Sequence, residues 1–200
     1  LNPDLCMIKI GSILFNSLGR RSFDLVADKG FNIFLDLKFH DIPNTVAHSI
    51  LSFKGYPINL LTVHISGGIN MLTRAREAAH AINAKIIGVS LLTSLDQKDV
   101  ERVFFNDIQK VADNLFILAQ EANLDGVVCS AYELKHAMIN IPNLLKIVPG
   151  IRLTSNSDDQ KRVMSAVEAL NLGANHLVIG RPITESRHPN TELEKILETL

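Results

Sequence analysis

The sequence has no tryptophan, few aromatic residues and only two cysteines. Aromatic residues make up 6% of the chain and apolar residues 46%, so we expect aliphatic side chains to fill the core. Cys6 and Cys129 are too few for a disulfide framework, which favours a reducing cytoplasm. No apolar run approaches the ~20 residues that a membrane span requires. These absences predict a soluble, cytoplasmic globular protein.

The sequence also lacks an excess of positive charge. Its 20 basic and 21 acidic residues leave a formal net charge of −1. A nucleic-acid or membrane-surface partner would require a clear basic excess, so neither is expected. No linker, low-complexity tract or long charge run is present, which predicts a single domain over residues 1–200. The chain opens without Met or a signal-peptide pattern, as if it began partway into a natural protein.

Seven short runs of apolar and β-branched residues are typical of buried strands. Most are almost continuously hydrophobic, which indicates parallel strands covered on both faces. The predicted strands are Met7–Gly11, Asn32–Phe39, Leu60–Ile65, Lys85–Leu92, Gly126–Ser130, Leu145–Ile151 and His176–Gly180.

Stretches with apolar residues at i, i+3 and i+4 lie between these runs and predict helices. Gly30, Gly55 and Gly173 follow three of them, where a left-handed C-cap is expected. The predicted helices are Ser22–Lys29, Thr45–Phe53, Asn70–Ile82, Asp107–Ala122, Ala131–Met138, Gln160–Leu172 and Thr191–Leu200.

This alternation predicts an α/β fold of repeated βα units, either an open doubly wound sheet or a (β/α)8 TIM barrel. The Gly-x-Gly-x-x-Gly fingerprint of dinucleotide folds is absent, which favours the barrel. A barrel needs eight strands and the sequence supplies seven. We therefore expect the first strand to be missing before Leu1.

One predicted buried strand carries charged residues near its end. Asp36 and Lys38 are two residues apart and should share one face of a regular strand. Asp41 follows in a loop, before a helix that Asn44 or Thr45 would cap. Chemistry in (β/α)8 enzymes lies at the carboxyl ends of the strands, so these charges indicate an active site. The alternative is a structural ion pair.

Lys9 ends the preceding predicted strand, between apolar neighbours. Adjacent strands would place Lys9 beside Asp36, which predicts a Lys-Asp-Lys-Asp cluster with almost no net charge. Such a cluster would keep Lys38 cationic and crowd a substrate anion against carboxylates. The alternative for Lys9 alone is a lysine that extends its ammonium to solvent.

The loops after the last two predicted strands indicate a phosphate site, as in many barrels. Gly180 would let backbone N–H groups approach a phosphate, and Arg181 would bind it in bidentate fashion. Gln160, in the loop that follows Arg152, would add a donor. The alternative for Gly180 and Arg181 is a turn with a solvated arginine.

Four further residues have open or structural interpretations. Thr93 and Ser94 would either reach a ligand or cap the next helix. His64 is interpreted as a hydrogen-bonded core histidine beneath the site rather than a base, and Cys129 as a small core residue. The sequence shows no His, Cys and carboxylate set with zinc spacing, so no metal is expected.

These segments resemble the orotidine 5′-phosphate decarboxylase family in its bacterial form. The Asp-x-Lys-x-x-Asp core is shared with related phosphosugar barrels, whereas the continuation through Thr45 and the segment Ile179–Thr184 are more specific. The resemblance runs in the family's order from about Lys9 to Thr184. Its motifs are Lys9-Ile10-Gly11, Asp36–Thr45, His64–Gly68, Leu92-Thr93-Ser94, Pro149–Arg152, Asp159–Arg162 and Val178–Thr184.

The resemblance implies decarboxylation of orotidine 5′-phosphate to UMP, the last step of UMP synthesis, without metal or organic cofactor. By family role, Lys38 protonates C6, Asp36 lies beside the substrate carboxylate, and Lys9 contacts the ribose and orders the network. A homodimer with shared active sites is also implied, through Asp41, Ile42 and Thr45. The remaining matched residues are Thr93 at the pyrimidine, Pro149, and the phosphate contacts Arg152, Gln160, Gly180 and Arg181.

Two other functions stay open. One is a related phosphosugar lyase or aldolase that holds a metal in the same acidic cluster, although the segment Phe39–Pro43 speaks against it. The other is a non-catalytic nucleotide-binding barrel. The four charges argue against that function, because a binding protein gains little from burying them.

Overall fold

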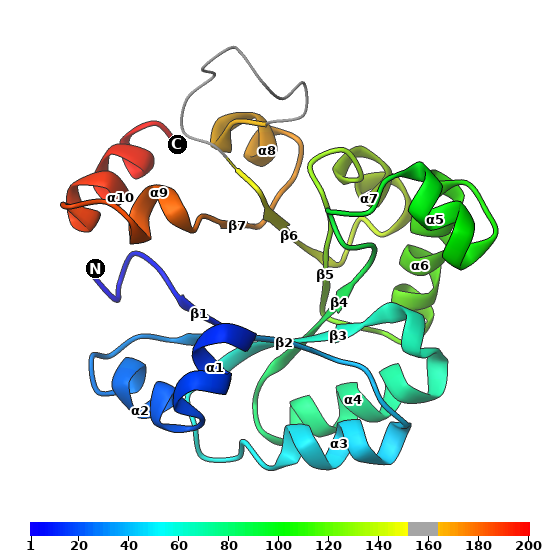
Figure 1. The fold of residues 1–200 in the computed structure, drawn as a ribbon, viewed down its shortest axis with the longest axis horizontal. Helices are drawn as coiled ribbons and strands as arrows, with labels where there is room; N and C mark the ends of the chain where they lie inside the picture. Colours follow the sequence, from blue (N-terminus) through cyan, green and yellow to red (C-terminus); the bar gives the residue numbers. More distant parts are fainter. Residues whose placement is uncertain (152–163) are drawn as a thin grey trace. The chain divides into compact units, whose positions relative to one another are not determined.

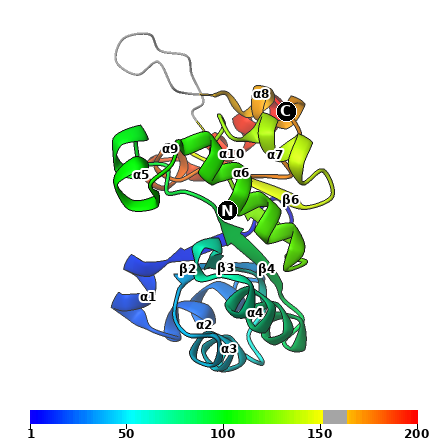
Figure 2. The same cartoon turned by 90° about the vertical axis from the view of Figure 1, so that its right-hand side faces the viewer.

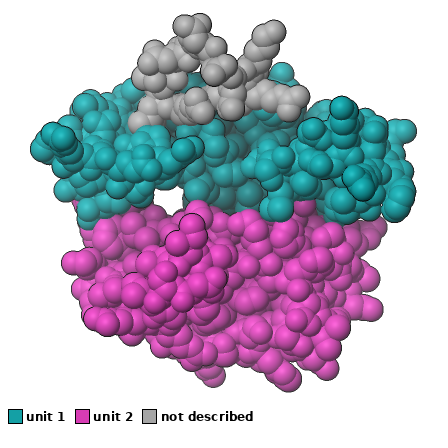
Figure 3. Space-filling model, viewed as in Figure 1, with its two compact units in different colours: residues 1, 91–116, 127–200 teal, residues 2–90, 117–126 magenta. Residues whose placement is uncertain are grey.

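The computed structural model describes residues 1–151 and 164–200. The chain divides into two compact units (Figure 3): unit 1 holds residue 1 and residues 91–116 and 127–200, and unit 2 holds residues 2–90 and 117–126. Seven strands occur in the described residues (Figure 1). Six of them lie within a predicted run, and the third begins two residues before its predicted run. The α/β class with parallel strands is therefore confirmed, and the single domain stays a prediction.

Unit 2 contains four parallel strands that pair in chain order, β1 with β2, β2 with β3 and β3 with β4. Helices α2, α3 and α4 lie along one side of these strands (Figure 2). The elements are β1 Ile8–Gly11, α1 Ser12–Leu18, α2 Arg21–Ala27, β2 Ile33–Phe39, α3 Pro43–Leu51, β3 Ile58–His64, the 3₁₀ turn η1 Ile65–Gly67, α4 Ile69–Ala81 and β4 Lys85–Val89.

Unit 1 contains shorter strands. Strand β6 pairs in parallel with β7, and Cys129, just after β5, donates its backbone N–H to Ile147 of β6. The elements are α5 Gln97–Phe104, α6 Ile108–Glu121, β5 Gly126–Val128, α7 Leu134–Asn140, β6 Leu145–Pro149, α8 Ala166–Asn171, β7 His176–Val178, α9 Arg181–Thr184 and α10 Pro189–Glu198. The last residues of α6 and the first of β5 belong to unit 2.

The core of unit 2 explains the continuous hydrophobicity of its strands. Ile10, Ile33, Leu35, Leu61 and Val63 are all fully buried, as expected for parallel strands covered on both faces. Aliphatic residues dominate this core, as expected, and the same unit also contains a group of neighbouring aromatic rings that are buried or half-buried. Its members are Phe15, Phe23, Phe39, Phe53 and Tyr56.

Helix α3 begins earlier than predicted, and the predicted cap is wrong. Its N-cap is Ile42, and Pro43 occupies the first turn together with Asn44 and Thr45. Proline is well suited to that position, because its fixed φ matches the helix and its missing N–H needs no partner there. Asp41 accepts a hydrogen bond from the Ile42 N–H at 2.6 Å just before this start.

Other helices were predicted in part. Gly30, Gly55 and Gly173 have φ values of 80°, 96° and 97°, so the left-handed backbone expected after three helices is confirmed. Helices α1, α5 and α9 were not predicted. Residues 160–163 of the predicted helix Gln160–Leu172 lie outside the described residues. Within the described ranges, no helix is long and apolar enough to cross a membrane.

Candidate active site

Unit 2 brings three of the predicted charged residues together near the carboxyl ends of β1 and β2. Lys9 Nζ lies 3.0 Å from Asp36 Oδ2, and Lys38 Nζ lies 2.8 Å from Asp36 Oδ1. Gly11 is paired with Asp36 in the β1–β2 register, so the long Lys9 side chain reaches along the strand to the carboxylate. The position of Lys9 beside Asp36 follows from this pairing of neighbouring strands.

The Asp36 carboxylate is the buried centre of this group. Its side chain is 12% exposed, whereas the Lys9 and Lys38 side chains are 36% and 34% exposed. Burial raises the pKa of Asp36, but the hydrogen bond from Lys38 and the charges of both lysines outweigh burial and leave that pKa lowered. Asp36 is therefore an ionised carboxylate at neutral pH, held between two partly exposed cations.

The backbone of Lys38 departs from the predicted regular strand. Its φ is +51°, a left-handed value that is uncommon outside glycine. Leu35 pairs with Leu61 but Phe39 pairs with Val63, so β2 advances four residues while β3 advances two. The side chains of Asp36 and Lys38 do meet, as expected for residues on one face, but the expected regular strand is interrupted at Lys38. Their side chains meet across a bulged segment, a feature that often re-aims a side chain near an active site.

Thr62, on β3, completes this group and was missed from the sequence. Its hydroxyl accepts the Lys38 backbone N–H at 2.9 Å and donates to Asp36 Oδ1 at 3.0 Å. The residue is fully buried. The available signal was its polarity, because a lone hydroxyl within the apolar run Leu60–Val63 needs a hydrogen-bond partner.

Asp41 takes a different position from the predicted fourth member of the cluster. Its carboxylate accepts a hydrogen bond from the backbone N–H of the next residue, Ile42, rather than joining the Lys9, Asp36 and Lys38 contacts described above. Asp41, Ile42 and Thr45 are all exposed, with Ile42 at 67%. Within this chain, the structure therefore brings together three of the four predicted charges.

His64 ends β3 and is half-buried rather than a core residue. The centre of its ring lies 5.5 Å from that of His40. Burial lowers the pKa of His64, and the charges of His40 and Lys38 lower it further against the opposing effect of Asp36. A neutral imidazole at physiological pH follows from this environment.

The other predicted substrate-binding residues that the structure describes lie in unit 1. Pro149 is the last residue of β6, Gly180 is the N-cap of α9, and Arg181 is the exposed first residue of that helix. Thr93 is in an exposed turn after β4. Capping of the next helix by Thr93 or Ser94 is wrong, because Asp96 caps α5. Arg152 and Gln160 lie outside the described residues.

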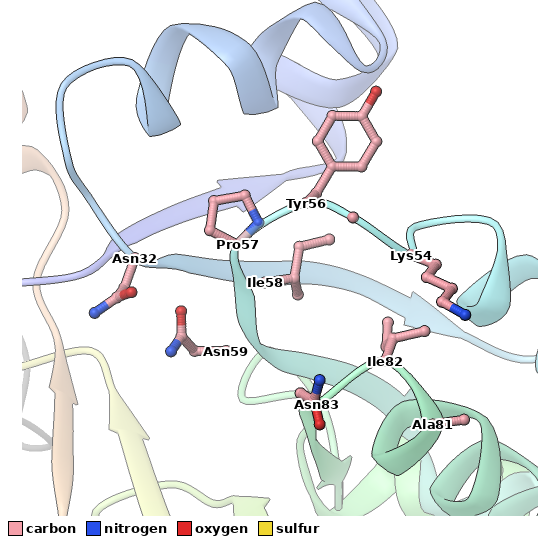
Figure 4. Close-up of a pocket in the computed structure, with 10 residues that line it drawn as sticks. Asn32, Lys54, Tyr56, Pro57, Ile58, Asn59, Ala81, Ile82 and Asn83 are labelled. Atoms are coloured by element: carbon pink, nitrogen blue, oxygen red, sulfur yellow. The ribbon is translucent and has the colours of Figure 1, made fainter.

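Three further features concern metal ligands, Cys129 and a pocket. In the described part of the chain, no group of three or more His, Cys, Asp or Glu side chains could hold a metal ion. Cys129 is fully buried, as predicted, and burial raises the pKa of its thiol to about 12. A pocket at the amino ends of β2 and β3 is lined by polar side chains that include Asn32, Asn59 and Asn83 (Figure 4). This is the end opposite to Lys38.

Parallel strands with a buried carboxylate held between two lysines define an α/β protein whose candidate site is built from charged side chains. Residues 1–196 match the family described as orotidine 5′-phosphate decarboxylase / HUMPS. The chain belongs to this family.

Individual relatives agree with the family match. The chain is 44% identical over 195 residues to orotidine 5′-phosphate decarboxylase of Ehrlichia chaffeensis, covering 96% of this chain and 84% of that protein. It is 42% identical to the enzyme of the same name from Wigglesworthia glossinidia brevipalpis, covering 100% and 88%. The solved structure of orotidine 5′-phosphate decarboxylase from Lactobacillus acidophilus is similar with a TM-score of 0.86 and 31% identity, covering 99% of this chain and 88% of that one.

Proposed function

We propose that this protein converts orotidine 5′-phosphate to UMP and CO₂ in pyrimidine biosynthesis. The observation that carries the proposal is the Lys9–Asp36–Lys38 group, with ion pairs of 3.0 and 2.8 Å, in a chain of this family. The two named relatives support the same reaction. No cofactor is required by the chemistry that follows.

In this reaction the bond between C6 and the substrate carboxylate breaks, CO₂ leaves, and the electron pair stays on C6. The Lys38 ammonium stabilises the developing negative charge and then donates a proton from Nζ to C6. Its ion pair with Asp36 holds the cation in place before substrate binds. A preformed cation is effective here because it needs no reorganisation at the moment of reaction.

Asp36 would lie beside the substrate carboxylate. The two like charges repel most strongly before the bond breaks, and less as charge moves from the carboxylate toward C6. Lys9 pairs with the other Asp36 oxygen, so it would keep that carboxylate ionised and oriented while its exposed end contacts the ribose. Each charged residue thereby has a separate part in the proposed step.

The remaining site residues extend the proposal to a homodimer. Exposed Asp41, Ile42 and Thr45 would enter the partner subunit's site, while Thr93 would contact the pyrimidine. The substrate phosphate would bind near Pro149 through Arg152, Gln160, Gly180 and Arg181, as the family resemblance implies.

We further propose that both units belong to one (β/α)8 barrel domain. We also propose that the protein works in the cytoplasm, as its cysteine content suggests.

A single assay tests the reaction. The loss of orotidine 5′-phosphate absorbance is followed with the purified protein, with and without a chelator. We expect turnover that the chelator leaves unchanged. Tight UMP binding without CO₂ release would instead indicate a nucleotide-binding protein. Because the Asp-x-Lys-x-x-Asp core is shared with related phosphosugar barrels, a chelator-sensitive lyase or aldolase activity on a phosphosugar is the second candidate.

Mixed dimers test the shared site. Lys38→Ala and Asp41→Ala should each inactivate the enzyme, because every site would lack one of the two residues. In an equimolar mixture of the variants, random subunit exchange should restore about a quarter of wild-type activity, since half of the dimers are hybrids with one intact site. No recovery after verified subunit exchange would contradict the shared-site proposal.

A further inference from the structure

We infer that Thr62 is a positioning residue that sets the place of the Lys38 ammonium by holding both the Lys38 backbone and the Asp36 carboxylate. This inference rests on the proposed decarboxylation. It adds a residue to that reaction which neither the charge pattern nor the family motifs indicated.

Four groups form a closed ring of hydrogen bonds. The Lys38 N–H donates to Thr62 Oγ1 at 2.9 Å, and the same hydroxyl donates to Asp36 Oδ1 at 3.0 Å. Lys38 Nζ then donates to that same carboxylate oxygen at 2.8 Å. The Lys38 backbone is therefore bound directly to Thr62 of β3, and its ammonium is linked to the same hydroxyl through Asp36.

This connection is needed because the strand ladder does not hold Lys38. Its left-handed backbone lies where β2 carries two more residues than β3 between matched pairs, so regular strand pairing is interrupted. Backbone N–H groups in such a bulge require another acceptor. Thr62 supplies that acceptor from a fully buried position on β3.

A purely space-filling role would be served equally well by valine. Valine has nearly the shape of threonine, but it can neither accept the Lys38 N–H nor donate to Asp36. The bulged segment would then lose its tie to β3, and the ammonium would shift relative to the reacting carbon. A displacement of about 1 Å from reacting geometry can lower a rate about 100-fold.

Two pairs of variants isolate the hydroxyl. Thr62→Val replaces the hydroxyl of the wild type by a methyl group at constant branching, and Thr62→Ala lacks only the hydroxyl that Thr62→Ser retains. We expect kcat to fall about 10- to 100-fold in the Val and Ala variants and to stay within about threefold of wild type in the Ser variant. The KM and the UMP dissociation constant should change less than about threefold throughout, because the uniform binding contacts remain.

Thr73→Val, on α4 outside the site, is the matched control and should keep wild-type kcat. UMP titration gives the fraction of folded sites, so kcat is expressed per binding-competent site and a loss of folded protein is not read as a loss of catalysis. If Thr62→Val does not fold, the Ser and Ala variants decide the question. Equal kcat in those two, or wild-type kcat in Thr62→Val, would overturn the inference while leaving the decarboxylase proposal intact. An inactive wild-type protein would overturn both.

Discussion

The predicted site residues of unit 2 and unit 1 are held in different ways. In unit 2, Asp36 is buried and bound by Lys9, Lys38 and Thr62 before any substrate is present. In unit 1, Gly180 and Arg181 are exposed at the start of a four-residue helix. The difference matches the proposed roles, because a group that acts on the reacting carbon must be fixed in advance. A phosphate contact instead supplies binding energy at a distance from the reaction.

The two regions also differ in their strands. Strands β2 and β3 of unit 2 have seven residues each, which leaves room for a bulge between paired segments. Strands β5 and β7 have three residues each, so the chain passes quickly into the following turn or helix. A long strand can thus place several side chains around one point, whereas a short strand mainly positions the loop that follows it. Three substitutions test this comparison between the two units.

Lys38→Ala should have the largest effect. Removing the proton donor and the cation should lower kcat about 1,000-fold or more, while UMP still binds. Steady-state decarboxylation and UMP titration measure the two quantities. The control is Lys54→Ala, an exposed lysine of the same unit beside the pocket at the opposite strand ends. Near-normal turnover in the Lys38 variant would contradict the role of Lys38 as the proton donor.

Arg181→Ala should have an intermediate effect of a different kind. Loss of a charge-assisted contact to the phosphate should raise KM about 10- to 100-fold and change kcat less. The thermal unfolding midpoint should stay the same, because the side chain is exposed. Arg187→Ala, another exposed arginine close by, serves as the control. An unchanged KM would separate unit 1 from phosphate binding.

The third substitution, Asp36→Asn, tests the stability of the fold, and its effect should be smaller in free energy than the kinetic effects of the other two. The folded-state pKa of Asp36 lies below its unfolded value, so its charge stabilises the fold above about pH 4 and loses that contribution as pH falls through the folded pKa. Urea unfolding should show the variant less stable than wild type by about 1–2 kcal/mol at pH 7, with the gap closing below about pH 4. Exposed Asp28→Asn is the control. A gap independent of pH would mean that the charge does not contribute.

Much of the fold was predictable because its signals are local. Each buried parallel strand is a short apolar run, and glycine marks the left-handed position after three helices. Helix α5 was missed because its sequence is mostly polar, and its Asp96 and Asp99 capping box was the overlooked signal. Helix α1 was missed because it follows β1 with no intervening loop.

The site was predictable only where neighbouring strands bring residues together. The sequence alone indicated Lys9, Asp36, Lys38 and Asp41 as one group, because charges in buried strands must be paired and consecutive strands are usually neighbours in the sheet. The structure brings the first three together, whereas Asp41 bonds the backbone of Ile42. The sequence also carried the family motifs. What only the tertiary structure decided is how Lys38 is held, through a left-handed residue, a bulge and the Thr62 hydroxyl. Those features depend on the register between β2 and β3. The register is set by packing across the two strands, so it cannot be predicted from the local sequence of either strand alone.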